Sequence, residues 1–131
     1  MSDAPILQAL ERYIQSINHA EDISLAEALW LCDDTPSMIF PLGKENGWNN
    51  IKNNFYGAVM CGRFSSRNLQ MISKPEIQLF ENFALARFDW EFHAITRADS
   101  SERETRGRES QVYIKSDGAW KLLHVHYSQL K

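Results

Sequence analysis

The segment from Gly118 to Ser128 restricts the possible folds of this chain more than any other. It begins at Asp117-Gly118, a dipeptide that favours a tight hairpin turn because both positions tolerate positive φ. Strand alternation would place one set of side chains on a common face: Trp120, Leu122, His124 and His126. The opposite face also carries large side chains. We therefore expect one face to lie against the core of the protein and the other against a partner.

Composition sets limits on the class of protein. The chain has 131 residues, of which 44% are hydrophobic and 24% charged, which predicts a single globular domain over residues 1–131. The formal net charge of −3 gives no general reason to bind nucleic acid or an anionic membrane. No apolar run approaches the roughly 18 residues that cross a bilayer. We expect neither nucleic acid nor membrane as a partner.

The termini and cysteines indicate the compartment. The first five residues lack the charged and apolar regions of a signal peptide. Cys32 and Cys61 do not make a disulfide framework, and we expect both to be buried, reduced thiols. These features predict a cytoplasmic protein.

The N-terminal half shows helical periodicity. Apolar residues from Ile6 to Ile17 recur at helical spacing and predict an amphipathic helix over residues 4–19. Ser24 and Glu27 have capping-box spacing and predict a second, short helix. A short strand from Ser37 to Pro41 and a polar loop from residue 42 to 47 should follow. A further apolar stripe then predicts a third helix: Ile51, Phe55 and Val59.

The residue pattern of the C-terminal half predicts strands. We predict them over residues 66–73, 75–81, 83–97, 104–116 and 119–129. In the third, the even positions from Ala84 to Ala94 are apolar and the odd positions are mostly polar, which assigns the even face to the core. Helices followed by strands indicate an α+β protein whose helices pack on one face of a curved, mostly antiparallel sheet.

Two segments carry a family resemblance. Residues 109–120, with the Asp-Gly turn and Trp120, and residues 123–128, with the pattern His-x-His-x-Ser, resemble the C-terminal hairpin of the SnoaL-like and nuclear-transport-factor-2-like superfamily. The resemblance is closest to the association (hub) domain of calcium/calmodulin-dependent protein kinase type II. It implies a cystatin-like or nuclear-transport-factor-2-like cone, with a pocket between helix and sheet and dimerisation through the outer sheet face.

The resemblance also suggests what lines the pocket. Arginine positions that could hold a carboxylate in the kinase hub fall here on Trp90, Gln111 and Tyr127, and none of these is basic. We therefore expect an aromatic, neutral cavity with Gln111 as a hydrogen-bonding group. The residues expected to line it are Tyr13, Ile51, Phe55, Val59, Trp90, Gln111 and Tyr127. The alternative is that these side chains fill the cone.

Catalytic and metal-binding patterns are incomplete. The segment Arg12-Tyr13-Ile14 resembles the one that holds the oxyanion tyrosine of ketosteroid isomerases, but their base position falls near Phe40-Pro41 here. We assign no catalytic residue. His124 and His126 share a strand face, yet a zinc site needs at least one more protein ligand. We predict no metal or cofactor and expect both imidazoles to hydrogen-bond across the sheet or across a dimer interface.

Three functional hypotheses remain open. The first is a homodimer that binds a small apolar or aromatic molecule in its cone, with Trp120, Leu122, His124 and His126 at the interface. The second is a self-association module of hub type, as a dimer or a larger ring, with an incidental pocket. The third is an isomerase-like or cyclase-like enzyme whose acid and base groups come from separate elements.

Overall fold

The computed structural model describes residues 2–130, which form one curved sheet with helices on one face. The strands are β1 (Ser37–Phe40), β2 (Gly43–Asn46), β3 (Phe64–Met71), β4 (Glu76–Leu79), β5 (Phe83–Thr96), β6 (Glu102–Ser116) and β7 (Ala119–Gln129). Their order is β2-β1-β7-β6-β5-β3, and β4 also pairs with β5. The pairings are antiparallel except for the parallel pair of β1 and β7. The predicted α+β class is confirmed.

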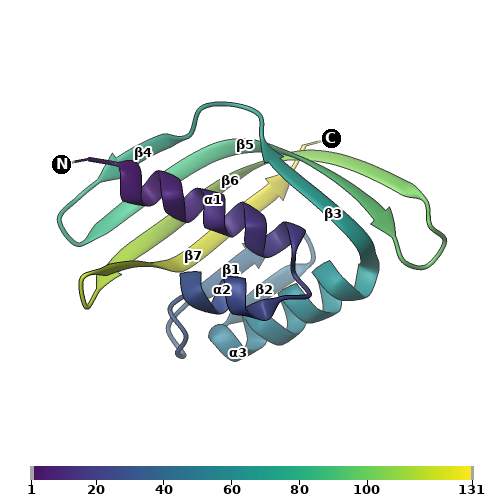
Figure 1. The fold of residues 1–131 in the computed structure, drawn as a ribbon, viewed down its shortest axis with the longest axis horizontal. Coiled ribbons are helices and arrows are strands. Elements are labelled where there is room, and N and C mark those ends of the chain that lie inside the picture. Colours follow the sequence, from purple (N-terminus) through teal and green to yellow (C-terminus); the bar gives the residue numbers. More distant parts are fainter. Residues whose placement is uncertain (1, 131) are drawn as a thin grey trace.

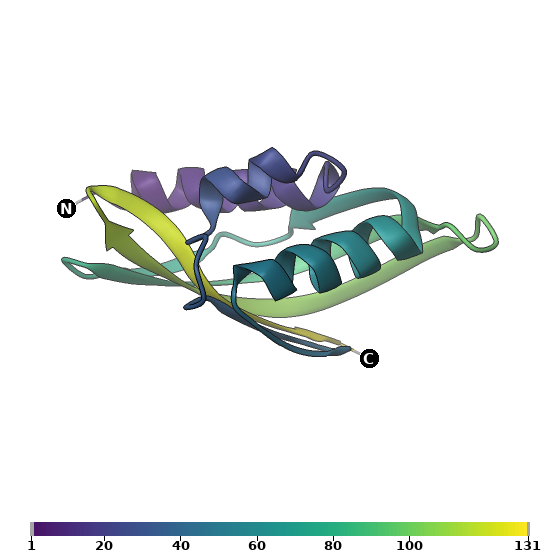
Figure 2. The same ribbon diagram turned by 90° about the horizontal axis from the view of Figure 1, so that it is seen from below.

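The helices all lie on the concave side of the sheet, as Figure 2 shows. They are α1 (Ala4–Asn18), α2 (Ile23–Leu29), α3 (Trp48–Asn50) and the π-helix η1 (Ile51–Cys61). The buried face of α1 carries most of the predicted apolar positions, including Ile6, Leu10 and Ile17, whereas Leu7 is exposed. No helix among residues 2–130 combines the length and apolar character that a bilayer crossing requires.

Two local predictions in the N-terminal half are wrong. The cap of α2 is Asp22, whose side chain accepts a hydrogen bond from the backbone nitrogen of Ser24, so the carboxylate performs the role predicted for the Ser24 hydroxyl. The predicted polar loop after residue 41 contains β2, which pairs with β1 through a tight hairpin. Backbone pairing at the edge of the sheet therefore outweighs the polar composition of this segment.

The third helix departs from α-helical geometry. Its buried residues are Ile51, Phe55, Tyr56 and Met60, a spacing of four to five residues that matches the wider turn of a π-helix. Val59, on the predicted 3.6-residue stripe, is only half-buried. The wider turn places two adjacent aromatic rings, Phe55 and Tyr56, in the core, with their ring centroids 5.1 Å apart.

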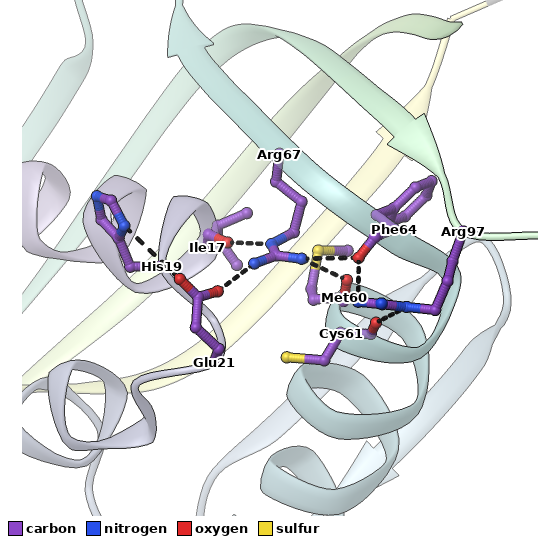
Figure 3. A network of polar contacts seen from close by, with 8 residues as sticks. All are labelled: Ile17, His19, Glu21, Met60, Cys61, Phe64, Arg67 and Arg97. Atoms are coloured by element: carbon purple, nitrogen blue, oxygen red, sulfur yellow. Dashed lines mark hydrogen bonds and ion pairs between the residues drawn. The ribbon is translucent and has the colours of Figure 1, made fainter. Parts of the chain in front are cut away.

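Two arginines hold the end of η1 against α1 and β3 (Figure 3). Arg67 donates hydrogen bonds to the backbone oxygens of Ile17, Met60 and Phe64, and it also contacts the carboxylate of Glu21. Arg97 donates to the backbone oxygens of Cys61 and Phe64. These bonds satisfy carbonyl groups that a helix end leaves without partners. They therefore fix the position of η1 relative to the sheet.

The long central strands follow the predicted alternation. On β5 the even positions from Ala84 to Ala94 are buried, as predicted. On β6 the residues that face the helices are Glu109, Gln111 and Tyr113, all buried. The bounds of β5 and β7 agree with the prediction within one residue, whereas β3 begins two residues earlier and β4 is shorter than expected.

A register shift corrects the predicted faces of β7. Tyr113 pairs with Leu122 but Val112 pairs with His124, so Leu123 is an extra residue in the strand. The bulge reverses the side-chain alternation. Leu122 is fully buried and Trp120 packs against the core, whereas His126 is exposed on the outer face. The prediction that Trp120, Leu122, His124 and His126 share one face is therefore wrong.

The cysteines also differ from the prediction. Both are free thiols, but Cys32 is exposed and Cys61 is only half-buried. Partial burial and the neighbouring Glu27 carboxylate raise the pKa of the Cys32 thiol. The position of Cys32, after the end of α2, explains its exposure because the chain leaves the core there.

Candidate functional site

A cavity of about 110 Å³ lies between the helices and the concave face of the sheet. Residues from α1, η1, β3, β5, β6, β7 and the β1–β2 turn line it: Tyr13, Ile17, Pro41, Leu42, Phe55, Val59, Met60, Arg63, Phe64, Leu69, Trp90, Phe92, Arg103, Thr105, Glu109, Tyr127 and Gln129. Dry apolar cavities of about 150 Å³ bind benzene. The enclosed space here is smaller than that, so it suits at most one ring, and any substituent would extend towards the opening.

The cavity has a polar mouth and an aromatic interior. Leu42, Arg63, Arg103 and Gln129 line it and are exposed, so they mark its opening. The interior side chains are mostly aromatic and mutually packed. The Tyr127 ring meets the Phe55 ring at 6.3 Å and the Trp90 ring at 5.7 Å, both edge to face.

Gly107 determines where the Trp90 indole lies. Trp90 on β5 pairs with Gly107 on β6, and a Cβ at position 107 would collide with the Trp90 ring and with the backbone oxygen of Ser128. The missing side chain lets the indole cross β6 towards Tyr127 on β7. A glycine inside β6 thus shapes one wall of the cavity.

A buried carboxyl group lies in the cavity wall. Glu109 on β6 is 5% exposed and pairs in register with Phe88 on one side and Tyr127 on the other. Its Oε2 accepts a hydrogen bond of 2.6 Å from Nε2 of Gln111, whose Oε1 in turn accepts one of 2.5 Å from the Tyr113 hydroxyl. These three residues face inward at alternate positions of one strand, which brings them into a chain of hydrogen bonds.

Burial controls the protonation of this carboxyl group. It raises the pKa of Glu109 from 4.5 to about 8, although hydrogen bonds from Gln111 and Tyr13 act in the opposite direction. Glu109 is therefore mainly a neutral carboxylic acid at pH 7. The pKa of Tyr13 is raised by burial and by the nearby Glu109, and that of Tyr127 is raised by the same two causes.

The structure places five of the seven predicted pocket residues around the cavity: Tyr13, Phe55, Val59, Trp90 and Tyr127. Ile51 and Gln111 are fully buried and lie outside the lining. Ile51 is part of the hydrophobic core. Gln111 acts on the cavity indirectly, through its bond to Glu109.

Sequence reasoning missed twelve of the lining residues, among them all three that carry a charged side chain: Arg63, Arg103 and Glu109. Glu109 has the same inward parity as Gln111, so strand alternation could have identified it. Arg103 lies near the start of β6, and its approach to the cavity depends on the curvature of the sheet. The lining of the cavity is therefore not wholly neutral, because two guanidinium groups lie at its mouth.

The two histidines of β7 lie on the outer side of the sheet. Nδ1 of His124 is 2.7 Å from the hydroxyl of Ser37 on β1, so one imidazole hydrogen-bonds across the sheet. Burial lowers the pKa of His124. Elsewhere on this face, Glu91, His93 and Glu104 lie close together, and Arg106 is 3.7 Å from Glu91. This cluster is largely solvent-exposed and already contains its own counter-charges.

The sequence profile of one family, the calcium/calmodulin dependent protein kinase II association domain, matches residues 2–131. The chain belongs to this association-domain family. A search of curated protein sequences found no match. A nuclear transport factor 2-like superfamily protein from Salmonella enterica serovar Typhimurium LT2 is 40% identical, covers 96% of this chain and 89% of its own, and superposes with a TM-score of 0.92.

More distant structures share the fold. Hexachlorocyclohexane dehydrochlorinase LinA-type3 from Novosphingobium barchaimii LL02 is 11% identical, with a TM-score of 0.83 over 98% of this chain and 86% of that one. A protein with a cystatin-like fold from Nostoc punctiforme PCC 73102 is 17% identical, with a TM-score of 0.77 over 98% and 90% of the two chains. The association-domain chain therefore has the nuclear-transport-factor-2-like fold that its C-terminal hairpin predicts.

Chemically, the cavity offers an apolar surface and a small set of polar groups. Its aromatic walls can bury a ring, and the Glu109 carboxyl group can donate or accept one proton near neutral pH. Concave apolar sites with few, fixed polar groups are the usual form of small-molecule sites.

Proposed function

We propose that the chain binds a small, mostly apolar or aromatic molecule in the cavity between helices and sheet. The observation that carries this proposal is the combination of open space, aromatic walls and a buried carboxyl group at one site. Filling the cone with protein side chains would have removed the space. Keeping an acidic group there costs stability, as the raised pKa of Glu109 implies, and such costs are common at binding sites.

Native mass spectrometry of the purified protein tests the proposal. We expect a bound molecule below a few hundred daltons, or binding of a small aromatic compound added at millimolar concentration. Val59→Trp, which adds bulk to the lining from η1, should abolish binding. Leu7→Trp is the matched control, because Leu7 is exposed on α1 and lies outside the cavity. Equal binding by both variants would contradict the proposal.

We propose further that the chain forms a homodimer through the outer face of its sheet, around His124 and His126. An open groove on this face is lined by residues of β5, β6 and β7, among them Arg108, Ser110 and His126. Light scattering should give the mass of two chains. Ser110→Arg, at the centre of this face, should give a monomer, while Glu81→Arg in the β4–β5 turn should not change the mass.

A second candidate function is self-association itself. The observation that favours it is the match to an association domain over residues 2–131. A closed ring of many copies in light scattering, together with a cavity that takes up no small molecule, would favour this role over ligand binding. A dimer that binds aromatic compounds would favour the first.

A further inference from the structure

A side chain in the cavity wall carries a hydrogen-bond donor without an acceptor. Nε1 of Trp90 is the one buried side-chain nitrogen or oxygen without a hydrogen-bond partner among residues 2–130. Trp90 is 4% exposed and lines the cavity. An indole N–H can only donate, and buried donors nearly always have a partner. An acceptor atom on a molecule bound in the cavity would give the indole N–H of Trp90 its missing hydrogen-bond partner.

The neighbouring Glu109 is a second donor, and its orientation is fixed. The Tyr113 hydroxyl donates to Oε1 of Gln111, which directs the amide nitrogen of Gln111 towards Oε2 of Glu109. Oε2 is therefore an acceptor, and the proton of the neutral carboxyl group belongs on Oε1. Gln111 thus acts as a positioning residue: it directs the acidic proton of Glu109 to Oε1, and the Tyr13 hydroxyl is the other side chain that hydrogen-bonds to this carboxyl group.

These two donors identify a ligand class. Resting on the proposed function, we infer that the ligand presents a neutral hydrogen-bond acceptor, a carbonyl oxygen on an aromatic or alicyclic body, to Nε1 of Trp90 and the carboxyl group of Glu109. An ammonium group would find no anion in the interior while Glu109 is protonated. A carboxylate would be drawn to Arg63 and Arg103, which lie at the mouth.

The surroundings of Glu109 make it the group that titrates. The titratable groups whose pKa values Glu109 affects are tyrosines from four elements: Tyr13 on α1, Tyr56 on η1, Tyr113 on β6 and Tyr127 on β7. Burial raises the pKa of each tyrosine above 10. Between pH 6 and pH 9.5 the ionisation of Glu109 therefore removes one donor without changing the others.

The test compares acetophenone with α-methylstyrene, in which a CH₂ group replaces the carbonyl oxygen at nearly unchanged shape. Ligand-detected NMR gives both dissociation constants for wild type, Trp90→Phe and the control Trp120→Phe, whose side chain lies outside the cavity. The affinity ratio of ketone to alkene should fall on the order of tenfold in Trp90→Phe and stay unchanged in the control. In wild type the same ratio should fall as the pH rises through about 8, the pKa of Glu109.

The outcomes separate the two proposals. If neither compound enters the wild-type cavity, the proposed function fails and the inference fails with it. If both bind but the ratio is the same in wild type and Trp90→Phe, and does not change from pH 6 to pH 9.5, ligand binding stands and the carbonyl preference is overturned. If Trp90→Phe unfolds, the pH dependence of the ratio in wild type decides the question alone.

Discussion

Replacing Glu109 with glutamine should stabilise the protein at neutral pH and remove part of its pH dependence. The substitution keeps the size of the side chain and supplies an amide oxygen that can accept from Gln111, as Oε2 of Glu109 does. It removes the ability to ionise. Glu109 is buried only in the folded protein, so the free-energy cost of keeping its carboxyl group protonated arises only in the folded state.

The magnitude follows from the two pKa values. In the unfolded chain the carboxyl group has a pKa near 4.5, and burial in the folded protein raises it to about 8. Below pH 4.5 both states are protonated and the contribution of the group to stability is complete. As the pH rises, the unfolded chain releases the proton while the folded chain keeps it, so stability falls until about pH 8.

One pKa unit corresponds to about 1.36 kcal/mol, so by pH 7 the wild-type protein has lost about 3 kcal/mol that Glu109→Gln retains. For a chain of this size that difference raises the melting temperature by roughly 10 °C. At pH 4 the two proteins should have nearly the same stability. The free energy of unfolding, measured by urea titration at pH 4, 5.5, 7 and 8.5, gives the whole curve.

Glu102→Gln provides the control, because Glu102 is an exposed glutamate on the same strand. Its stability should follow the wild-type curve at every pH. The reasoning is refuted if Glu109→Gln is less stable than wild type at pH 7, or if its stability falls between pH 4.5 and pH 8 as steeply as that of the wild type.

Three further substitutions test how the cavity is built. Gly107→Ala should destabilise the fold by about 1–3 kcal/mol, because the added methyl group collides with the Trp90 ring and with the backbone oxygen of Ser128; an unchanged urea midpoint would mean that both the indole and the β7 backbone move aside freely. Leu122→Ala should cost about 2–5 kcal/mol and His124→Ala about 1 kcal/mol, and equal losses would argue against the bulge that buries only the leucine. Arg67→Met should lower the free energy of unfolding by at least about 2 kcal/mol, because it leaves buried carbonyl groups without donors. Arg63→Met is the control, and an equal loss in both variants would mean that the hydrogen bonds of Arg67 do not stabilise the fold.

The sequence predicts those parts of the fold that depend on short-range periodicity. Alternation on β5 places Trp90 inward, and the Asp117-Gly118 turn places the final hairpin. The faces of β7 could not be predicted in the same way. A single extra residue at Leu123 reverses every side chain on one side of it, and no composition signal marks that position.

The same distinction applies to the residues of the candidate site: some could be predicted from spacing and others could not. Residues that lie inward on regular elements, such as Tyr13 on α1 and Trp90 on β5, could be assigned from spacing. The position of Val59 relative to the cavity depends on the wide turn of η1, and that of Arg103 depends on sheet curvature. The raised pKa of Glu109 depends on everything packed around it, so it follows only from the assembled fold.

We infer that Glu109 is a neutral acid in the wall of the cavity in which we propose that a ligand binds. A ¹³C NMR titration of the glutamate side-chain carboxyl carbons, with the Glu109 signal assigned by its absence in Glu109→Gln, measures this directly. The account predicts a midpoint at about pH 8. A Glu109 signal that titrates near pH 4.5, as a solvated glutamate does, would contradict it.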